Sequence, residues 1–150
     1  MAQKRSKKYN PNKHAAKAFL PEKVVQDSLS VLRTTLMRLR LSQKKPQDLV
    51  VLAVYWAIGL HLSGRMEEAD QLRATFSALL EMFREEVYRP GSMSGEVYDA
   101  CLDALPLYEA FLRQTTIGDM NTAQAFIAKN GGVPEMRAFL DCIEKPEGAD

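Results

Sequence analysis

The stretch from Leu49 to Leu62 constrains the fold most, because almost every side chain in it is apolar. Its sequence, LVVLAVYWAIGLHL, is 14 residues long and contains His61 near its end. A membrane-spanning helix needs roughly 20 such residues. A shorter helix that is apolar on all sides must instead be covered by neighbouring helices. We therefore predict a buried central helix that begins at Pro46 and is stopped by Gly64.

The segments around this helix predict the elements that cover it. Their apolar residues recur in alternating steps of three and four, the spacing of a helix face that contacts another helix. The first of these helices is expected over about residues 21–42. The three apolar seams are Val25, Leu29, Leu32, Leu36 and Leu39; Ala69, Leu72, Phe76, Leu79 and Phe83; and Tyr98, Cys101, Leu105, Tyr108 and Leu112.

Local signals predict where the later helices begin and end. Ser94 follows a Pro- and Gly-containing loop and is the expected N-cap of the fourth helix, in which Pro106 is expected to cause a kink. Asp119 is the expected cap of a fifth helix that ends at residues 130–132, Asn-Gly-Gly. Pro134 then begins a short sixth helix.

These elements predict an all-α fold, a helical bundle of four main helices plus two short C-terminal helices, with a basic N-terminal tail. A chain of 150 residues is long enough for one domain with a real core. We expect residues 1–20 to form a disordered basic tail, residues 21–145 to form the single helical-bundle domain, and residues 146–150 to be a frayed terminus.

The charges of the chain are separated along the sequence. Residues 1–45 contain 12 Lys and Arg against 2 Asp and Glu, a net charge of +10, whereas residues 46–150 contain 8 against 17, a net charge of −9. Clustered cations with an interleaved aromatic residue are typical of phosphate binding. The predicted site for nucleic acid or another polyanion comprises Lys4, Arg5, Lys7, Lys8, Tyr9, Lys13, Lys17, Arg33, Arg38 and Arg40. Lys44 and Lys45 could extend this basic surface.

The basic tail has three possible roles. It can bind DNA or RNA, it can bind an acidic protein surface, or it can have no specific role beyond solvation. No recognition-helix hairpin stands out in the body of the chain. Binding to a nucleic acid would therefore depend on charge and show little sequence preference.

Residues that carry catalysis or bind metals are scarce. No HExxH, GxSxG or phosphate-binding glycine loop is present. We interpret His61 as a histidine at the edge of the core, and Cys101 and Cys142 as reduced, buried, small apolar residues. The protein is therefore predicted to be non-enzymatic, with no metal site and no cofactor. A metal-dependent enzyme that uses bundle carboxylates is the least favoured alternative.

The acidic cluster of Glu81, Glu85 and Glu86 is the strongest candidate for such a carboxylate site. Glu81 and Glu85 lie four residues apart on one helix face. Bundle carboxylates that hold two metal ions are usually accompanied by an ExxH motif, which this sequence lacks. We therefore interpret the cluster as a solvated face.

The sequence AVYWAIGLHLSGRMEEADQL, residues 53–72, resembles the helical hairpin of a tetratricopeptide repeat. The matching residues are those of the turn, Gly64, Arg65, Glu67, Glu68 and Ala69. The resemblance covers about 20 residues, and no second copy follows at the family's 34-residue period. It implies a helical hairpin and a role in protein interaction.

The opening sequence KRSKKYNP is similar to the openings of small all-helical accessory proteins encoded by phages and prophages. This resemblance covers only the first dozen residues. It implies a bacterial cytoplasmic protein that acts by binding host machinery.

The sequence as a whole predicts a cytoplasmic binding or adaptor protein without a membrane partner. Its bundle is expected to engage a protein or nucleoprotein complex while the basic tail contacts nucleic acid or another polyanion. The alternative is a self-associating structural or regulatory protein, possible as a homodimer, in which exposed aromatic residues such as Phe83 and Tyr108 pair between chains.

Overall fold

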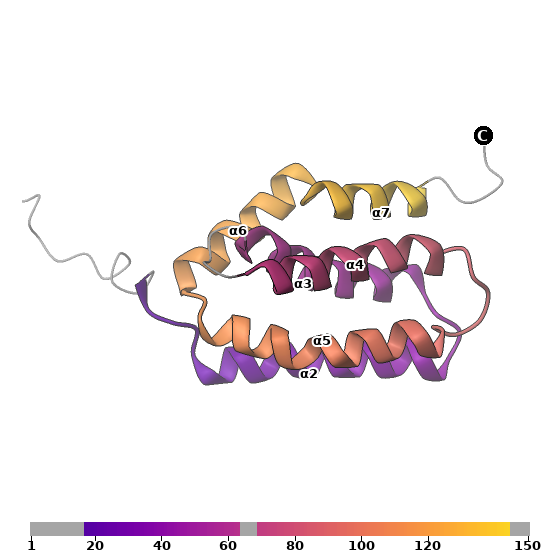
Figure 1. The fold of residues 1–150 in the computed structure, drawn as a ribbon, viewed down its shortest axis with the longest axis horizontal. Coiled ribbons are helices and arrows are strands. Elements are labelled where there is room, and N and C mark those ends of the chain that lie inside the picture. Colours follow the sequence, from indigo (N-terminus) through magenta and orange to yellow (C-terminus); the bar gives the residue numbers. More distant parts are fainter. Residues whose placement is uncertain (1–16, 64–68, 145–150) are drawn as a thin grey trace, which may run out of the picture.

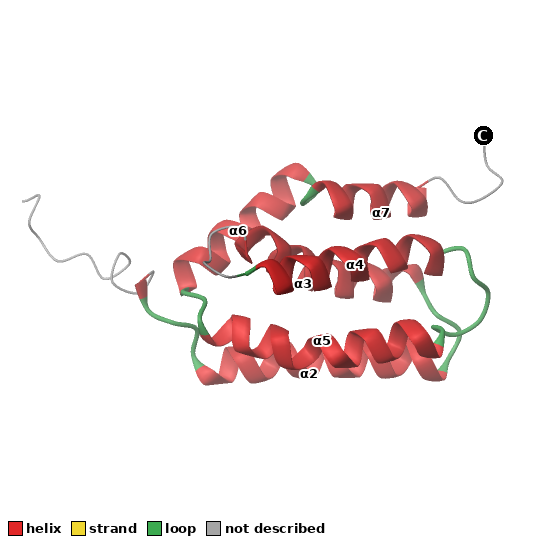
Figure 2. Cartoon of the chain, in the orientation of Figure 1, coloured by secondary structure: helices red, strands yellow, loops and turns green. Residues whose placement is uncertain are grey.

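The computed structural model describes residues 17–63 and 69–144. These ranges contain six α-helices and no strand, which confirms the predicted all-α class (Figure 2). The two short C-terminal helices are also confirmed. The helices are α2 (Glu22–Leu41), α3 (Pro46–Ser63), α4 (Asp70–Glu86), α5 (Gly95–Arg113), α6 (Ile117–Asn130) and α7 (Pro134–Glu144).

The helices lie in layers (Figure 1). Helices α2 and α5 run side by side in opposite directions, α3 and α4 form the middle of the molecule, and α6 and α7 cover it on the other side. Helix α3 packs most extensively on α4 and also contacts α2, α6 and α7. No side chain between Leu49 and Ser63 is exposed, so the predicted central helix that begins at Pro46 is confirmed, while its predicted stop at Gly64 lies outside the described residues. None of the helices described is long and apolar enough to cross a membrane.

The three predicted seams form the core. The five seam residues of α2 are all buried, and in α4 and α5 only Leu72 and Tyr98 are half-buried rather than buried. The prediction that Phe83 and Tyr108 are exposed was wrong, because both side chains are 0% exposed. A heptad position faces the neighbouring helices of its own bundle, which leaves neither ring available to pair with another chain.

Four aromatic rings contact one another at the centre of the core. The rings of Trp56 and Phe76 stack, with centroids 5.5 Å apart and planes inclined by 12°. Tyr108 meets both rings edge-on, at 5.5 and 5.7 Å, and Phe111 completes the group. Gly59 lets α3 approach this cluster closely, since a Cβ atom at this position would lie 2.5 Å from Cε2 of Phe76.

The start of α6 differs from the prediction. Thr116, not Asp119, is the N-cap, and its side chain accepts a hydrogen bond from the backbone N–H of Asp119. Asp119 lies in the first turn, where a negative charge interacts favourably with the positive end of the helix dipole. The end of the helix is as predicted, with Gly131 in the left-handed conformation at φ 72°.

The predicted cap of α5 is confirmed. The Ser94 hydroxyl accepts a hydrogen bond from the backbone N–H of Val97 at 3.3 Å. The backbone N–H of Ser94 also donates to the Glu86 carboxylate at 2.8 Å, which joins the start of α5 to the end of α4. The helix then continues through Pro106 to Arg113.

Replacing Ser94 by alanine is expected to lower the free energy of unfolding by about 1–2 kcal/mol, because the N-cap acceptor is lost. Urea unfolding of the full chain measures the change. The matched control is Ser30→Ala on the exposed face of α2, which removes a hydroxyl that caps nothing and should change stability by less than about 0.5 kcal/mol. Equal effects of the two substitutions would contradict the assigned cap.

A short segment before α2 is joined to the connection between α5 and α6. The backbone N–H of Leu20 donates to the carbonyl of Thr115 at 3.1 Å, and that of Ile117 donates to the carbonyl of Ala18 at 2.9 Å. Phe19 and Thr116 form an isolated antiparallel bridge between these bonds. The last residues of the predicted basic tail therefore lie against the bundle.

Candidate polyanion-binding surface

Most of the predicted polyanion site precedes the residues that the structure describes. Lys4, Arg5, Lys7, Lys8, Tyr9 and Lys13 lie outside the described ranges. Lys17 is described and exposed, immediately before the segment that pairs with Thr115–Ile117. The other three predicted residues, Arg33, Arg38 and Arg40, lie on α2.

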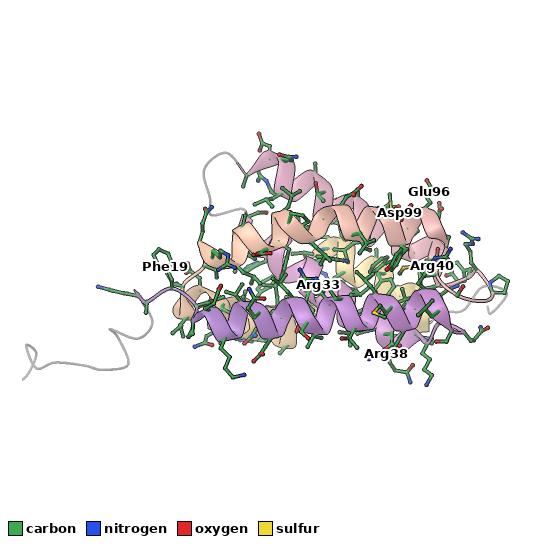
Figure 3. The ribbon with its side chains drawn as sticks, turned by 90° about the horizontal axis from the view of Figure 1, so that it is seen from below. Phe19, Arg33, Arg38, Arg40, Glu96 and Asp99 are labelled. Carbon is green, nitrogen blue, oxygen red and sulfur yellow. The ribbon has the colours of Figure 1, made fainter. Side chains whose placement is uncertain are left out.

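The three arginines of α2 do not share one face. Arg33 and Arg40 are seven residues apart and lie toward α5, whereas Arg38 lies on the opposite side of the helix (Figure 3). Arg40 donates to the carbonyl of Met93 at 3.4 Å, beside the start of α5. Arg38 donates to the carboxylate of Asp48 at 3.1 Å, so its charge is already paired with an acid on α3.

Lys44 does not extend the basic surface, as the sequence had suggested, because its side chain is only 5% exposed. Its ammonium group donates to the carbonyls of Arg89 and Gly91, at 2.5 and 3.3 Å, and lies 3.6 Å from the Glu86 carboxylate. A lysine buried in this way holds the loop before α5 in place. Lys45, the next residue, is exposed.

Glu86 corrects the prediction of a solvated acidic face. Glu81 and Glu85 are exposed, but the Glu86 side chain is only 1% exposed. Its carboxylate accepts the N–H of Ser94 and lies beside Lys44. One face of α4 therefore carries solvated acids while its last residue anchors a buried ion pair.

Acids also pair with most of the other cations of the bundle. Arg113 bonds to Glu22 and to Glu109, which ties α5 to the first turn of α2. The hydrogen bond from Arg113 lowers the pKa of Glu22 below its usual value. Other pairs are Lys23–Asp27 at 2.9 Å, Arg73–Asp70 at 2.6 Å and Arg84–Glu81 at 3.2 Å, and the exposed Arg89 lies 3.9 Å from the buried Glu86 carboxylate.

The exposed side of α5 carries an acidic stripe. Glu96, Asp99 and Asp103 are exposed and spaced by three and four residues, which places them on one face. Glu96 and Asp99 lie on the side of α5 away from α2 (Figure 3). Leu102, 38% exposed, adds an apolar side chain beside the stripe.

The potential metal ligands and nucleophiles are dispersed. In residues 17–63 and 69–144 no three His, Cys, Asp or Glu side chains come together as a metal-binding group. The His61 ring is half-buried and stacks on Phe126 at 4.3 Å, as expected of a histidine at the core edge.

The two cysteines differ in their surroundings. Both are free thiols, and burial raises the pKa of Cys101 to about 12, so this thiol is unreactive near neutral pH. The prediction that Cys142 is buried was wrong, because it is only half-buried near the end of α7, the outermost helix of the bundle.

The resemblances to tetratricopeptide hairpins and to phage accessory proteins stay predictions. No family model, no curated protein and no solved structure matches this chain.

Proposed function

We propose that this protein is a non-enzymatic binding protein whose N-terminal cations contact nucleic acid or another polyanion while its bundle engages a protein partner. The observation that carries the proposal is the separation of charge. Residues 1–45 hold a net charge of +10, and most cations of the bundle are paired with acids. The cations before Lys17 thus form the largest concentration of like charge in the sequence.

A cluster of cations favours binding to any polyanion and does not by itself select a base sequence. Each Lys or Arg that contacts a phosphate releases condensed counterions, so affinity falls steeply as salt is raised. Tyr9 lies among these cations and can stack on an unpaired base. Free cysteines suit the reducing cytoplasm, where we expect the protein to act.

The acidic stripe of α5 (Glu96, Asp99 and Asp103) is the best candidate for the protein-binding surface. It is exposed, it carries one sign of charge, and Leu102 gives it an apolar contact. Such a surface suits a partner with a basic face, because complementary charge speeds association and orients the two proteins.

The salt dependence of binding tests the role of the N-terminal cations. The full chain is titrated with short DNA and RNA duplexes at several salt concentrations, beside a variant in which Lys4, Arg5, Lys7 and Lys8 are changed to glutamine. If all four contact phosphates of B-DNA, the slope of log affinity against log salt should become shallower by roughly 3 to 4. A truncation should remove only residues 1–16, because Ala18 and Leu20 bond to the bundle.

A matched variant controls for net charge. Lys23, Arg73, Lys129 and Arg137 are exposed on the bundle, and changing these four to glutamine removes the same charge. This control should keep most of the salt dependence. Equal loss in both variants would reject a specific role for the N-terminal cations, as would undiminished binding by the chain that lacks residues 1–16.

The same titration tests whether the N-terminal cations bind the acidic stripe of their own chain. If the N-terminal cations bind the acidic stripe of their own bundle, changing Glu96 to glutamine and Asp99 and Asp103 to asparagine should release them and tighten nucleic-acid binding. If the stripe serves a separate protein, this variant should bind the duplexes much as the unmodified chain does.

A further inference from the structure

A pocket of about 340 Å³ lies where α2, α3 and α6 meet above Tyr108 of α5. Its volume is in the range of sites that bind small molecules, roughly 300–1,000 Å³. Val24 on α2 and Ala128 on α6 are exposed and form its outer rim, whereas Ile58 and Tyr108 are buried at its base. The pocket is therefore open to solvent at one end and enclosed by the core at the other.

The lining of the pocket is uncharged. Its polar members are Ser28, Tyr55, Tyr108 and Gln124, and all the other lining residues are aliphatic side chains or methionine. Among the described residues no Asp, Glu, Lys or Arg lines the pocket, so no described side chain would balance the charge of a buried ion. A neutral molecule suits such a lining.

The hydroxyl of Tyr108 lacks a hydrogen-bond partner in the described part of the chain, although the side chain is 0% exposed. A buried hydroxyl without a partner costs free energy that most proteins avoid. Burial raises the pKa of Tyr108 well above 10, with a smaller contribution from Tyr55, so the group remains a neutral phenol. It can therefore donate or accept one hydrogen bond.

The lining offers more apolar than polar surface. Among its described residues, six aliphatic or methionine side chains outnumber the four polar ones. Removing apolar surface from water is favourable, at roughly 25 cal/mol per Å². An apolar molecule seated in the pocket would therefore gain free energy by displacing water from it.

We propose that the pocket between α2, α3 and α6 binds a neutral, mainly apolar small molecule whose carbonyl or hydroxyl group forms a hydrogen bond with Tyr108. The aliphatic lining removes the apolar body of the ligand from water, and the Tyr108 hydroxyl gains the partner that it lacks. This inference does not depend on the polyanion role, since the described residues that line the pocket all belong to α2, α3, α5 and α6.

The test uses 6-propionyl-2-(dimethylamino)naphthalene, a neutral ketone whose fluorescence shifts to the blue in apolar surroundings. Titration of the full chain should give saturable binding at one site per chain and a higher melting temperature. Tyr108→Phe removes only the hydroxyl and should weaken binding about five- to tenfold. Its stability should not fall, because the lost hydroxyl had no partner in the described structure.

Substitutions at the rim locate the probe. Ala128→Phe places a ring in the mouth of the pocket and should abolish binding, whereas Ala125→Phe makes the same change at an exposed position of α6 that does not line it. Far-UV circular dichroism checks that each variant is folded. The proposal is overturned if the unmodified chain shows no saturable binding, if both rim variants behave alike, or if Tyr108→Phe binds the probe with unchanged affinity.

Discussion

Replacing Glu86 by alanine is expected to lower the free energy of unfolding by about 3–5 kcal/mol, the usual cost of removing one partner of a buried ion pair. The substitution leaves the Lys44 ammonium buried beside an apolar methyl group and takes away the acceptor of the Ser94 N–H. The connection between α2 and α3, which carries Lys44, and the connection between α4 and α5, which carries Ser94, meet at this carboxylate. Urea unfolding of the full chain, followed by circular dichroism, measures the loss.

The neighbouring acid provides the control. Glu85 is exposed on the same helix, so Glu85→Ala should change stability by less than about 0.5 kcal/mol. The double variant Lys44→Met, Glu86→Leu removes both charges and should be more stable than Glu86→Ala, because no unpaired charge remains buried. Similar losses for Glu85→Ala and Glu86→Ala would contradict the buried pair.

Replacing Gly59 by alanine is expected to cost about 3 kcal/mol, at the upper end of the range for overpacking a core. The new Cβ would lie 2.5 and 2.7 Å from two carbons of the Phe76 ring. This ring cannot move aside easily, since it stacks on Trp56 and meets Tyr108 edge-on. The steric cost should exceed the roughly 1 kcal/mol that alanine gains over glycine in a helix. Thermal and urea unfolding both report the change.

A smaller partner should relieve the clash. Combining Gly59→Ala with Phe76→Leu should lose less stability than the sum of the two single substitutions, with a coupling of about 1–3 kcal/mol. Gly95→Ala is the matched control, because its Cβ would meet only Arg40, at an ordinary 3.5 Å. If the losses of stability in the double variant were additive, the clash between a Cβ at position 59 and the Phe76 ring would not be the cause of the Gly59→Ala loss.

Helix positions were predictable because they depend on local spacing. The apolar seams, the proline starts at Pro46 and Pro134 and the cap at Ser94 are all encoded within a few neighbouring residues. The wholly apolar stretch of α3 also predicted its central place. The cap of α6 was predicted wrongly because Thr and Asp are both favoured at N-cap positions. In the structure the backbone N–H of Asp119 donates to the Thr116 hydroxyl, which makes Thr116 the N-cap.

Pairings between distant residues were not predictable in the same way. Lys44 and Glu86 are far apart in sequence, and each lies in a charged cluster that resembles a solvated surface. Only the folded connection before α5 brings them together. The pocket likewise forms only where three helices meet. The one feature of the sequence that could have indicated it is the presence of tyrosines at core positions, because a buried tyrosine hydroxyl needs a hydrogen-bond partner.

The bridge between Phe19 and Thr116 determines how a mechanical load would enter the molecule. A pull on the chain ahead of Lys17, such as tension on a tethered polyanion, would reach the bonds of Ala18 and Leu20 before the first turn of α2. That force would act on the turn between α5 and α6, some hundred residues further along the sequence. Tension on the N-terminal side would thus be borne first by the connection between α5 and α6, and the bundle would be strained across its width rather than unwound from its first helix.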